Sequence, residues 1–233
     1  HIKYLGVLMD EHLTWKYQII SVSKKISRGV GILSKLKNFM GVELLKSIYY
    51  CLVYSHLSYG IEAWGSASAD DLNKILVLQK KAVRIMSGNQ YFQIYGEPAV
   101  PLPASEPLFK KLKILKISDV FILNISKFIF LTLLGQSPAI FSSWFTLSNS
   151  IHNHATTSTT IINRDHHFAT GTVASTKTIF TRGSNLAKYG ARMIRVSGPI
   201  IWNRLPTTIQ DSPSLPTFKI HLKKHLINSY TDT

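Results

Sequence analysis

Two adjacent carboxylates, Asp70 and Asp71, come nearest in this sequence to the residue types and spacing that metal-ion chemistry needs. Paired aspartates in a turn that follows an aromatic residue hold two metal ions in sites of phosphoryl transfer. Here Ser68 stands where the aromatic residue belongs, and a helical pattern begins at Leu72. Because the N-terminus of a helix favours negative charge, we interpret the pair as a helix cap. We therefore predict neither a catalytic residue nor a metal site at this pair.

Other arrangements of catalytic residues are equally weak. Four histidines lie in one polar stretch, but their spacing matches no helical pair of metal ligands, and their acidic neighbour is Asp165 alone. They are His152, His154, His166 and His167. The sequence has no Gly-x-Ser-x-Gly elbow and no glycine-rich phosphate loop ending in Lys-Ser/Thr. We expect no metal ion, no cofactor, no small-molecule substrate and no enzyme activity in the chain by itself.

Positive charge is the strongest chemical signal. The 233 residues include 27 Lys and Arg against 12 Asp and Glu, which gives a formal net charge of +15. Such a surplus costs self-repulsion unless an anionic partner relieves it, so nucleic acid is the expected partner. A basic surface that is merely solvated is the alternative. The single cysteine, Cys51, excludes an internal disulfide and a cysteine-rich zinc finger, and its apolar neighbours predict a buried thiol.

The first element that would position these charges is a helix that starts near Thr14, its expected cap. Apolar residues recur along it at steps of three and four, which predicts one buried face: Trp15, Ile19, Val22, Ile26, Val30 and Leu33. Lys24, Arg28 and Lys35 project together on the opposite side, with Gly31 among them. The glycine leaves a notch through which a phosphate could reach the backbone, or it is a tolerated weak spot in a solvated face.

A second basic stripe follows on a helix that starts at Asp70, after a predicted helix over residues 42–54 that buries Leu45, Ile48, Tyr49 and Leu52. Tyrosines 17, 49, 50 and 54 could stack on bases. Aromatic residues at helical spacing more often belong to the core, so we assign the predicted nucleic-acid contacts to basic side chains. These are Lys24, Arg28, Lys35, Lys74, Lys80, Lys81 and Arg84.

The pattern as a whole predicts a mainly α fold. A short N-terminal β-strand within residues 1–9 leads into a helical domain over 1–88, and a Pro- and Gly-rich linker covers 89–107. A C-terminal helical extension over 108–233 has expected helices at 108–114, 118–134, 186–193 and 215–228, and a short strand near Val196. Its region 142–178 is rich in Ser, Thr, Asn and His and is expected to be irregular. The longest apolar stretch, 120–134, is shorter than the roughly 20 residues of a bilayer span, so we expect no membrane partner.

Five short blocks stand in a characteristic order along the chain. They are Tyr4-Leu5-Gly6-Val7 with Asp10 and Trp15, the segment from Ile48-Tyr49 to Trp64-Gly65, Leu78-Gln79-Lys80-Lys81-Ala82 with Arg84, Pro107-Leu108-Phe109 to Asp119, and Gly198 with Trp202-Asn203 to Phe218-Lys219. Together they resemble the end of the palm, the thumb and the region after the thumb in reverse transcriptases of non-LTR, LINE-like retrotransposons, jockey-like elements in particular.

The resemblance implies a thumb-like bundle over residues 1–88, and it places the catalytic aspartates upstream, on fingers and palm. We therefore expect a noncatalytic C-terminal fragment of an RNA-directed DNA polymerase that grips template and primer. Its expected partners are RNA or an RNA/DNA hybrid and the missing fingers-palm domain, in a nuclear or cytoplasmic ribonucleoprotein. Some related elements end in a Cys and His finger, for which this chain lacks the cysteines. The alternative is a decayed or domesticated transposon remnant that acts as a structural or protein-interaction module.

Overall fold

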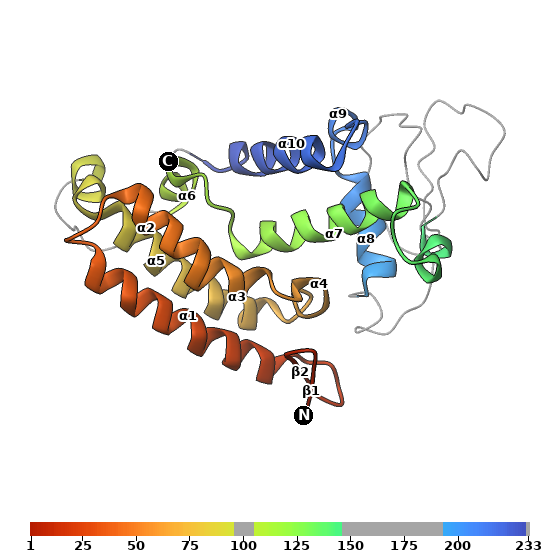
Figure 1. Ribbon diagram of the computed structural model, residues 1–233, viewed down its shortest axis with the longest axis horizontal. Helices are drawn as coiled ribbons and strands as arrows, with labels where there is room; N and C mark the ends of the chain where they lie inside the picture. Colours follow the sequence, from red (N-terminus) through yellow and green to blue (C-terminus); the bar gives the residue numbers. More distant parts are fainter. Residues whose placement is uncertain (96–104, 146–192, 232–233) are drawn as a thin grey trace. The chain divides into compact units, whose positions relative to one another are not determined.

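The structure is a computed structural model that describes residues 1–95, 105–145 and 193–231 (Figure 1). Most of these residues are helical, and the one sheet among them has two short strands, so the prediction of a mainly α fold is confirmed. Contacts group the chain into two compact units, residues 1–121 with 223–233 and residues 122–222. The predicted domain boundary at 89–107 stays a prediction, because residues 96–104 lie outside the described part.

The N-terminal strand is in fact a hairpin. Strand β1, Ile2–Tyr4, pairs with the antiparallel strand β2, Val7–Met9. Leu5 and Gly6 connect them with φ values of 45° and 85°, and two positive φ angles are what a type I′ hairpin turn requires. The prediction of one strand was wrong in this respect, although Gly6 was the sequence signal for the turn. The Tyr59 hydroxyl donates a hydrogen bond to the Leu5 carbonyl and ties the hairpin to the helices.

Helix α1, Lys16–Leu36, carries the expected buried face. All six predicted apolar residues are buried: Trp15, Ile19, Val22, Ile26, Val30 and Leu33. The predicted cap, Thr14, was wrong. The Asp10 carboxylate instead accepts hydrogen bonds from the backbone N–H groups of Thr14 and Trp15, both at 2.9 Å. Burial opposes the ionisation of Asp10, but these hydrogen bonds outweigh it and lower the pKa of the carboxyl.

The next helical segment changes its winding. Helix α2, Val42–Tyr49, continues as the π-helical turn η1, Tyr50–Tyr54, and then as α3, Ser55–Ser58. A π-helical turn is wider than an α-helical one, so the buried positions recur every four residues, at 45, 49, 53 and 57. Cys51 therefore faces solvent, and the prediction of a buried thiol was wrong.

Gly29 sets how closely α1 approaches η1. A Cβ atom at this position would lie 2.9 Å from the Leu52 carbonyl oxygen and 3.2 Å from Cγ2 of Val53. No other residue type fits without a shift of one of the two segments. Gly29 is therefore part of the packing between α1 and η1.

Helix α5, Ala69–Tyr95, follows the single turn α4, Ile61–Trp64, and has non-helical backbone angles at Gly88. Its Gln79 side chain is fully buried and makes three hydrogen bonds. The amide nitrogen donates to the Tyr49 hydroxyl at 2.8 Å and to the Leu115 carbonyl at 2.7 Å, and the amide oxygen accepts from the Ile117 N–H at 3.0 Å. Gln79 thus connects α5 with α2 and with the start of α7.

Helices α6, Glu106–Leu112, and α7, Ile117–Leu133, lie where the sequence predicts them. The 3-10 helix η2, Ala139–Trp144, follows α7. Along the described part of the chain, no helix is long and apolar enough to cross a membrane.

The second unit contains α8, Ile194–Asn203, α9, Thr207–Gln210, and most of α10, Leu215–Asn228. Phe218 stacks on Phe130 and on Trp202, at ring-centroid distances of 4.5 and 5.9 Å. The strand predicted near position 196 was wrong, because packing of α8 outweighs the local signals. The region predicted to be irregular, 142–178, begins within the 3-10 helix η2, and its residues 146–178 lie outside the described part. Of the helix predicted at 186–193, only Met193 is described.

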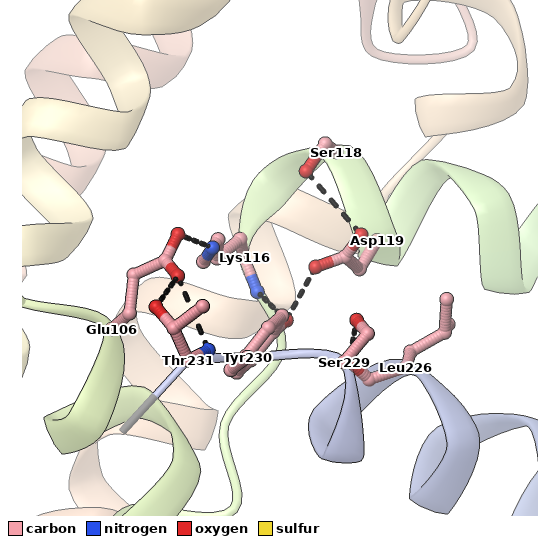
Figure 2. A network of polar contacts seen from close by, with 8 residues as sticks. All are labelled: Glu106, Lys116, Ser118, Asp119, Leu226, Ser229, Tyr230 and Thr231. Carbon is pink, nitrogen blue, oxygen red and sulfur yellow. Dashed lines mark hydrogen bonds and ion pairs between the residues drawn. The ribbon is translucent and has the colours of Figure 1, made fainter. Parts of the chain in front are cut away.

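A polar network ties the end of the chain to α6 and α7 (Figure 2). The Tyr230 hydroxyl donates to the Asp119 carboxylate and accepts from the Lys116 N–H at 3.0 Å. The Lys116 ammonium pairs with Glu106 and lies 4.3 Å from the centroid of the Tyr230 ring. Thr231 donates its hydroxyl to Glu106 at 2.8 Å. The first unit is therefore built from both ends of the described chain.

We predict that Gly29→Ala lowers the free energy of unfolding by about 1 to 3 kcal/mol, because the added methyl group overpacks the contact with η1. Gly31→Ala on the same helix is the matched control. A Cβ at position 31 meets no atom within 4 Å, so alanine should stabilise the helix by about 0.5 to 1 kcal/mol. Urea unfolding followed by circular dichroism measures both; equal effects of the two substitutions would contradict the assignment of Gly29.

We also predict that Tyr230→Phe costs about 1 to 3 kcal/mol of stability, because the Asp119 carboxylate and the Lys116 N–H lose a shared partner. The ring itself remains, so the loss of stability measures the contribution of the hydroxyl group alone. Tyr4→Phe removes the hydroxyl of an exposed tyrosine and should change stability by less than about 0.5 kcal/mol. Unfolding curves that do not distinguish the two variants would show that the network adds no stability.

Candidate nucleic-acid interface

Helices α1 and α5 run side by side in the same direction (Figure 1), with a surface groove between them. The groove consists of two adjoining depressions of about 520 and 350 Å³, which share Ser27 and Leu78. We call it the α1/α5 groove. Residues between positions 19 and 35 of α1 form one wall, and Lys74, Leu78 and Lys81 of α5 form the other.

Five of the seven predicted basic residues line this groove. Lys24, Arg28 and Lys74 surround the larger depression, and Lys35 and Lys81 surround the smaller one. All five are exposed. Basic side chains from two helices thus line one groove. A concave surface that carries charge of one sign produces a stronger local electrostatic field than a flat row of charges on one helix.

The two remaining predicted residues, Lys80 and Arg84, are half-buried and do not line the groove. Successive helical residues are about 100° apart, so Lys80 is turned well away from Lys81. The stripe that the sequence predicts on α5 is therefore divided, because only a narrow flank of α5 faces α1. A role for Lys80 or Arg84 in nucleic-acid binding stays a prediction.

The groove also contains small and apolar residues, of which only Gly31 was expected there from the sequence. Ser23, Ser27, Gly31 and Ser34 line the α1 wall, and Ile20 and Leu78 add apolar surface. The steps of four, four and three between the small residues place them on one flank of α1, so helical projection was the signal that could have found them. They leave the groove open and supply hydroxyl groups.

Asp71 lies near one end of the groove as part of a helix cap. The Ser68 hydroxyl accepts from the Asp71 N–H at 3.2 Å and donates to its carboxylate at 2.7 Å. The Lys74 ammonium donates to the same carboxylate at 2.7 Å. The Lys74 hydrogen bond outweighs burial and lowers the pKa of Asp71, with a smaller contribution from the charge of Lys16. Asp70 and Asp71 lie in the first turn of α5, where the sequence predicts negative charge, but the residue that caps the helix is Ser68. Asp71 also offsets part of the charge of Lys74.

Metal-ligand clusters are absent from the described residues, where no three His, Cys, Asp or Glu side chains gather to hold an ion. The histidines at 152, 154, 166 and 167 lie outside those residues.

The candidate stacking tyrosines are elsewhere. Tyr49 is buried and bonded to Gln79, and burial raises the pKa of its hydroxyl. Tyr50 and Tyr54 are half-buried and contact each other edge to face at 5.1 Å, and Tyr17 stacks on His1 at 4.4 Å. No aromatic side chain of the described residues lines the groove. The groove can therefore grip an anion by charge and hydrogen bonds, without stacking.

The chain is similar to the RNA-directed DNA polymerase from mobile element jockey of Drosophila funebris, with 34% identity over 93 residues, and to its counterpart in Drosophila melanogaster, with 31% over 93 residues. A probable RNA-directed DNA polymerase from transposon X-element of Drosophila melanogaster is 27% identical over 94 residues. These matches cover 39% of this chain and 10% of each relative. The resemblance to polymerases of non-LTR mobile elements is confirmed over that segment.

No protein-family model matches the chain, and no solved structure matches it either.

The Asp71 cap generates a prediction about pH. A carboxyl whose pKa is lowered by folding stabilises the fold above its unfolded pKa, about 4 for aspartate, and this contribution is lost as the pH falls below that value. Asparagine keeps the size of the side chain, so Asp71→Asn removes mainly the charge and should cost about 0.5 to 1 kcal/mol at pH 7. We expect the difference from the unsubstituted chain to be smaller at pH 3 than at pH 7.

Urea unfolding at the two pH values measures this loss. Asp70→Asn, at the neighbouring exposed carboxylate, is the control for the helix-terminus charge alone and should cost less at pH 7. A deficit of Asp71→Asn that persisted unchanged at pH 3 would mean that the charge of Asp71 is not what stabilises the cap.

Proposed function

We propose that this chain is a nucleic-acid-gripping part of an RNA-directed DNA polymerase of a non-LTR mobile element. In this proposal the α1/α5 groove holds the phosphate backbone of RNA or of an RNA/DNA hybrid within a nuclear or cytoplasmic ribonucleoprotein. One observation carries the proposal. Five exposed cations from two helices converge on a single groove, in a chain similar to polymerases of that kind.

Counterion release supplies the binding energy in such a groove. Each phosphate that a Lys or Arg neutralises releases condensed counterions, and the logarithm of affinity falls by about 0.7 to 0.9 per phosphate for each unit in the logarithm of salt concentration. Asp71 offsets one of the five cations, Lys74. About four effective contacts predict a salt slope of about −3 to −4. Backbone contacts carry no base information, so we expect little sequence preference.

We propose that polymerisation is carried out by other parts of a longer protein that resembles these relatives. The aspartate pair at 70 and 71 sits at the start of α5, and Asp71 is engaged with Ser68 and Lys74. The chain spans about a tenth of the length of the relatives it matches, which leaves room in such a protein for a separate catalytic domain. The chain by itself is therefore proposed to bind without catalysis.

A protein-interaction module is the second candidate function, and the hairpin favours it. Ile2, Tyr4 and Leu5 are 72%, 62% and 74% exposed. Exposed apolar residues that lie together mark surfaces that another protein covers, and we propose the fingers-palm domain as that partner. Binding of this kind depends on buried apolar area, so its affinity should change little with salt.

The test of the groove is charge reversal. We predict that the triple variant Lys24→Glu, Arg28→Glu, Lys35→Glu binds a labelled RNA/DNA hybrid at least about 100-fold more weakly than the unsubstituted chain at 0.1 M salt, with a salt slope shallower by about 3. Fluorescence anisotropy across a salt series measures both quantities.

The matched control reverses three exposed lysines that do not line the groove, Lys3, Lys25 and Lys37. Its net charge changes by the same amount, so long-range attraction is equally reduced, and we expect a loss of less than about tenfold. Equal losses of affinity in both triple variants would show that binding depends on net charge alone and not on the groove. An unchanged affinity of the groove variant would exclude the groove as the binding site.

A further inference from the structure

We propose that Gly31 is the point where one strand's sugar–phosphate backbone comes closest to α1, and that the groove binds this backbone without contacting bases. This inference rests on the proposed function, and it names the ligand chemistry of the same groove. It is carried by the space around Gly31, by the groups that surround that space, and by what the groove does not contain.

There is free space beside Gly31, whereas Gly29, two residues earlier, is in close contact with neighbouring atoms. A Cβ at position 31 would meet no atom within 4 Å, whereas one at position 29 would lie 2.9 Å from the Leu52 carbonyl oxygen. Gly31 is exposed and lines the smaller depression. Glycine inside a helix costs about 0.5 to 1 kcal/mol relative to alanine, and packing explains that cost at Gly29 but not at Gly31. An occupant of the groove that needs the backbone uncovered does explain it.

The groups around Gly31 suit a phosphate. Ser27 and Ser34 line the same depression about one turn before and after it, and both are exposed. Lys35 stands on the same helix and Lys81 on the opposite wall. Hydroxyls donate to phosphate oxygens, and ammonium groups neutralise them. From Ser27 to Ser34 the helix rises about 10 Å, so this part of the groove is longer than one nucleotide of a strand.

The composition of the groove argues against base contacts. Base recognition on a single strand relies on aromatic or guanidinium stacking and on side chains that reach base edges. The lining holds serines, aliphatic residues and lysines with one arginine, and the described aromatic side chains lie elsewhere. An acidic peptide would also be negatively charged, but its charges would not be spaced as regularly as the phosphates of a nucleic-acid backbone. We therefore assign the groove to the backbone.

The experiment enlarges residue 31 and leaves every charge in place. Gly31→Ala should raise thermal stability and weaken binding of the RNA/DNA hybrid by about 3-fold, and Gly31→Leu should weaken it by at least about 10-fold with an unchanged salt slope. Ser47→Leu is the control, because it adds an exposed leucine on α2, away from the groove. A circular-dichroism melt of each full chain confirms that it is folded.

Two competitors test the ligand class. An abasic DNA strand should displace the hybrid about as well as an ordinary strand of the same length, and polyglutamate should displace it at least about 10-fold less well. If the abasic strand competes poorly, the claim of backbone binding without bases is overturned. If polyglutamate competes as well, the occupant is an acidic protein rather than nucleic acid.

The Gly31 result is separable from the proposed function. Should Gly31→Leu bind like the unsubstituted chain while the triple charge reversal abolishes binding, the groove remains the binding site and the close approach at Gly31 is wrong. Should neither variant change binding, both the proposed function and this inference fail.

Discussion

The buried side chain of Gln79 is the interaction on which the first unit depends most. Its amide meets Tyr49, Leu115 and Ile117 from three separate segments, and a buried amide without partners would cost a few kcal/mol. Rotation of α5 about its axis would break all three hydrogen bonds at once. Because Lys74, Leu78 and Lys81 stand on another flank of the same helix, the bonds of Gln79 also decide which side chains α5 turns toward α1.

Packing has to offset the repulsion among the groove cations. The five buried apolar residues of α1 each contribute about 1.5 to 3 kcal/mol, which is more than exposed like charges cost in water. The two glycines of this helix have different structural roles. Gly29 faces inward and lets η1 approach, while Gly31 faces outward and leaves the groove wall bare. One helix thus combines a tightly packed face with an open, basic one.

Chain order and spatial order differ in this molecule. Tyr230 and Thr231, near the end of the chain, join α6 and α7 through Glu106, Lys116 and Asp119, so the first unit contains both ends of the described sequence. The aromatic contacts of Phe130, Trp202 and Phe218 form a separate core in the second unit. Contacts between segments far apart in the chain build the first unit, and periodicity along the sequence does not reveal such contacts.

The sequence by itself determined the features that depend on neighbours in the chain. The buried face of α1, the positions of α6, α7 and α10 and the acidic first turn of α5 follow from local spacing. The resemblance to polymerases of mobile elements rests instead on the order of short sequence blocks. Tertiary structure decided the rest. It placed Lys74 and Lys81 opposite Lys24, Arg28 and Lys35, turned Lys80 away, exposed Cys51 through a π-helical turn and made a helix of the residues around Val196. The physical reason is that periodicity describes one helix at a time, whereas the flank that faces a neighbour is set by packing and buried hydrogen bonds between segments far apart in the chain.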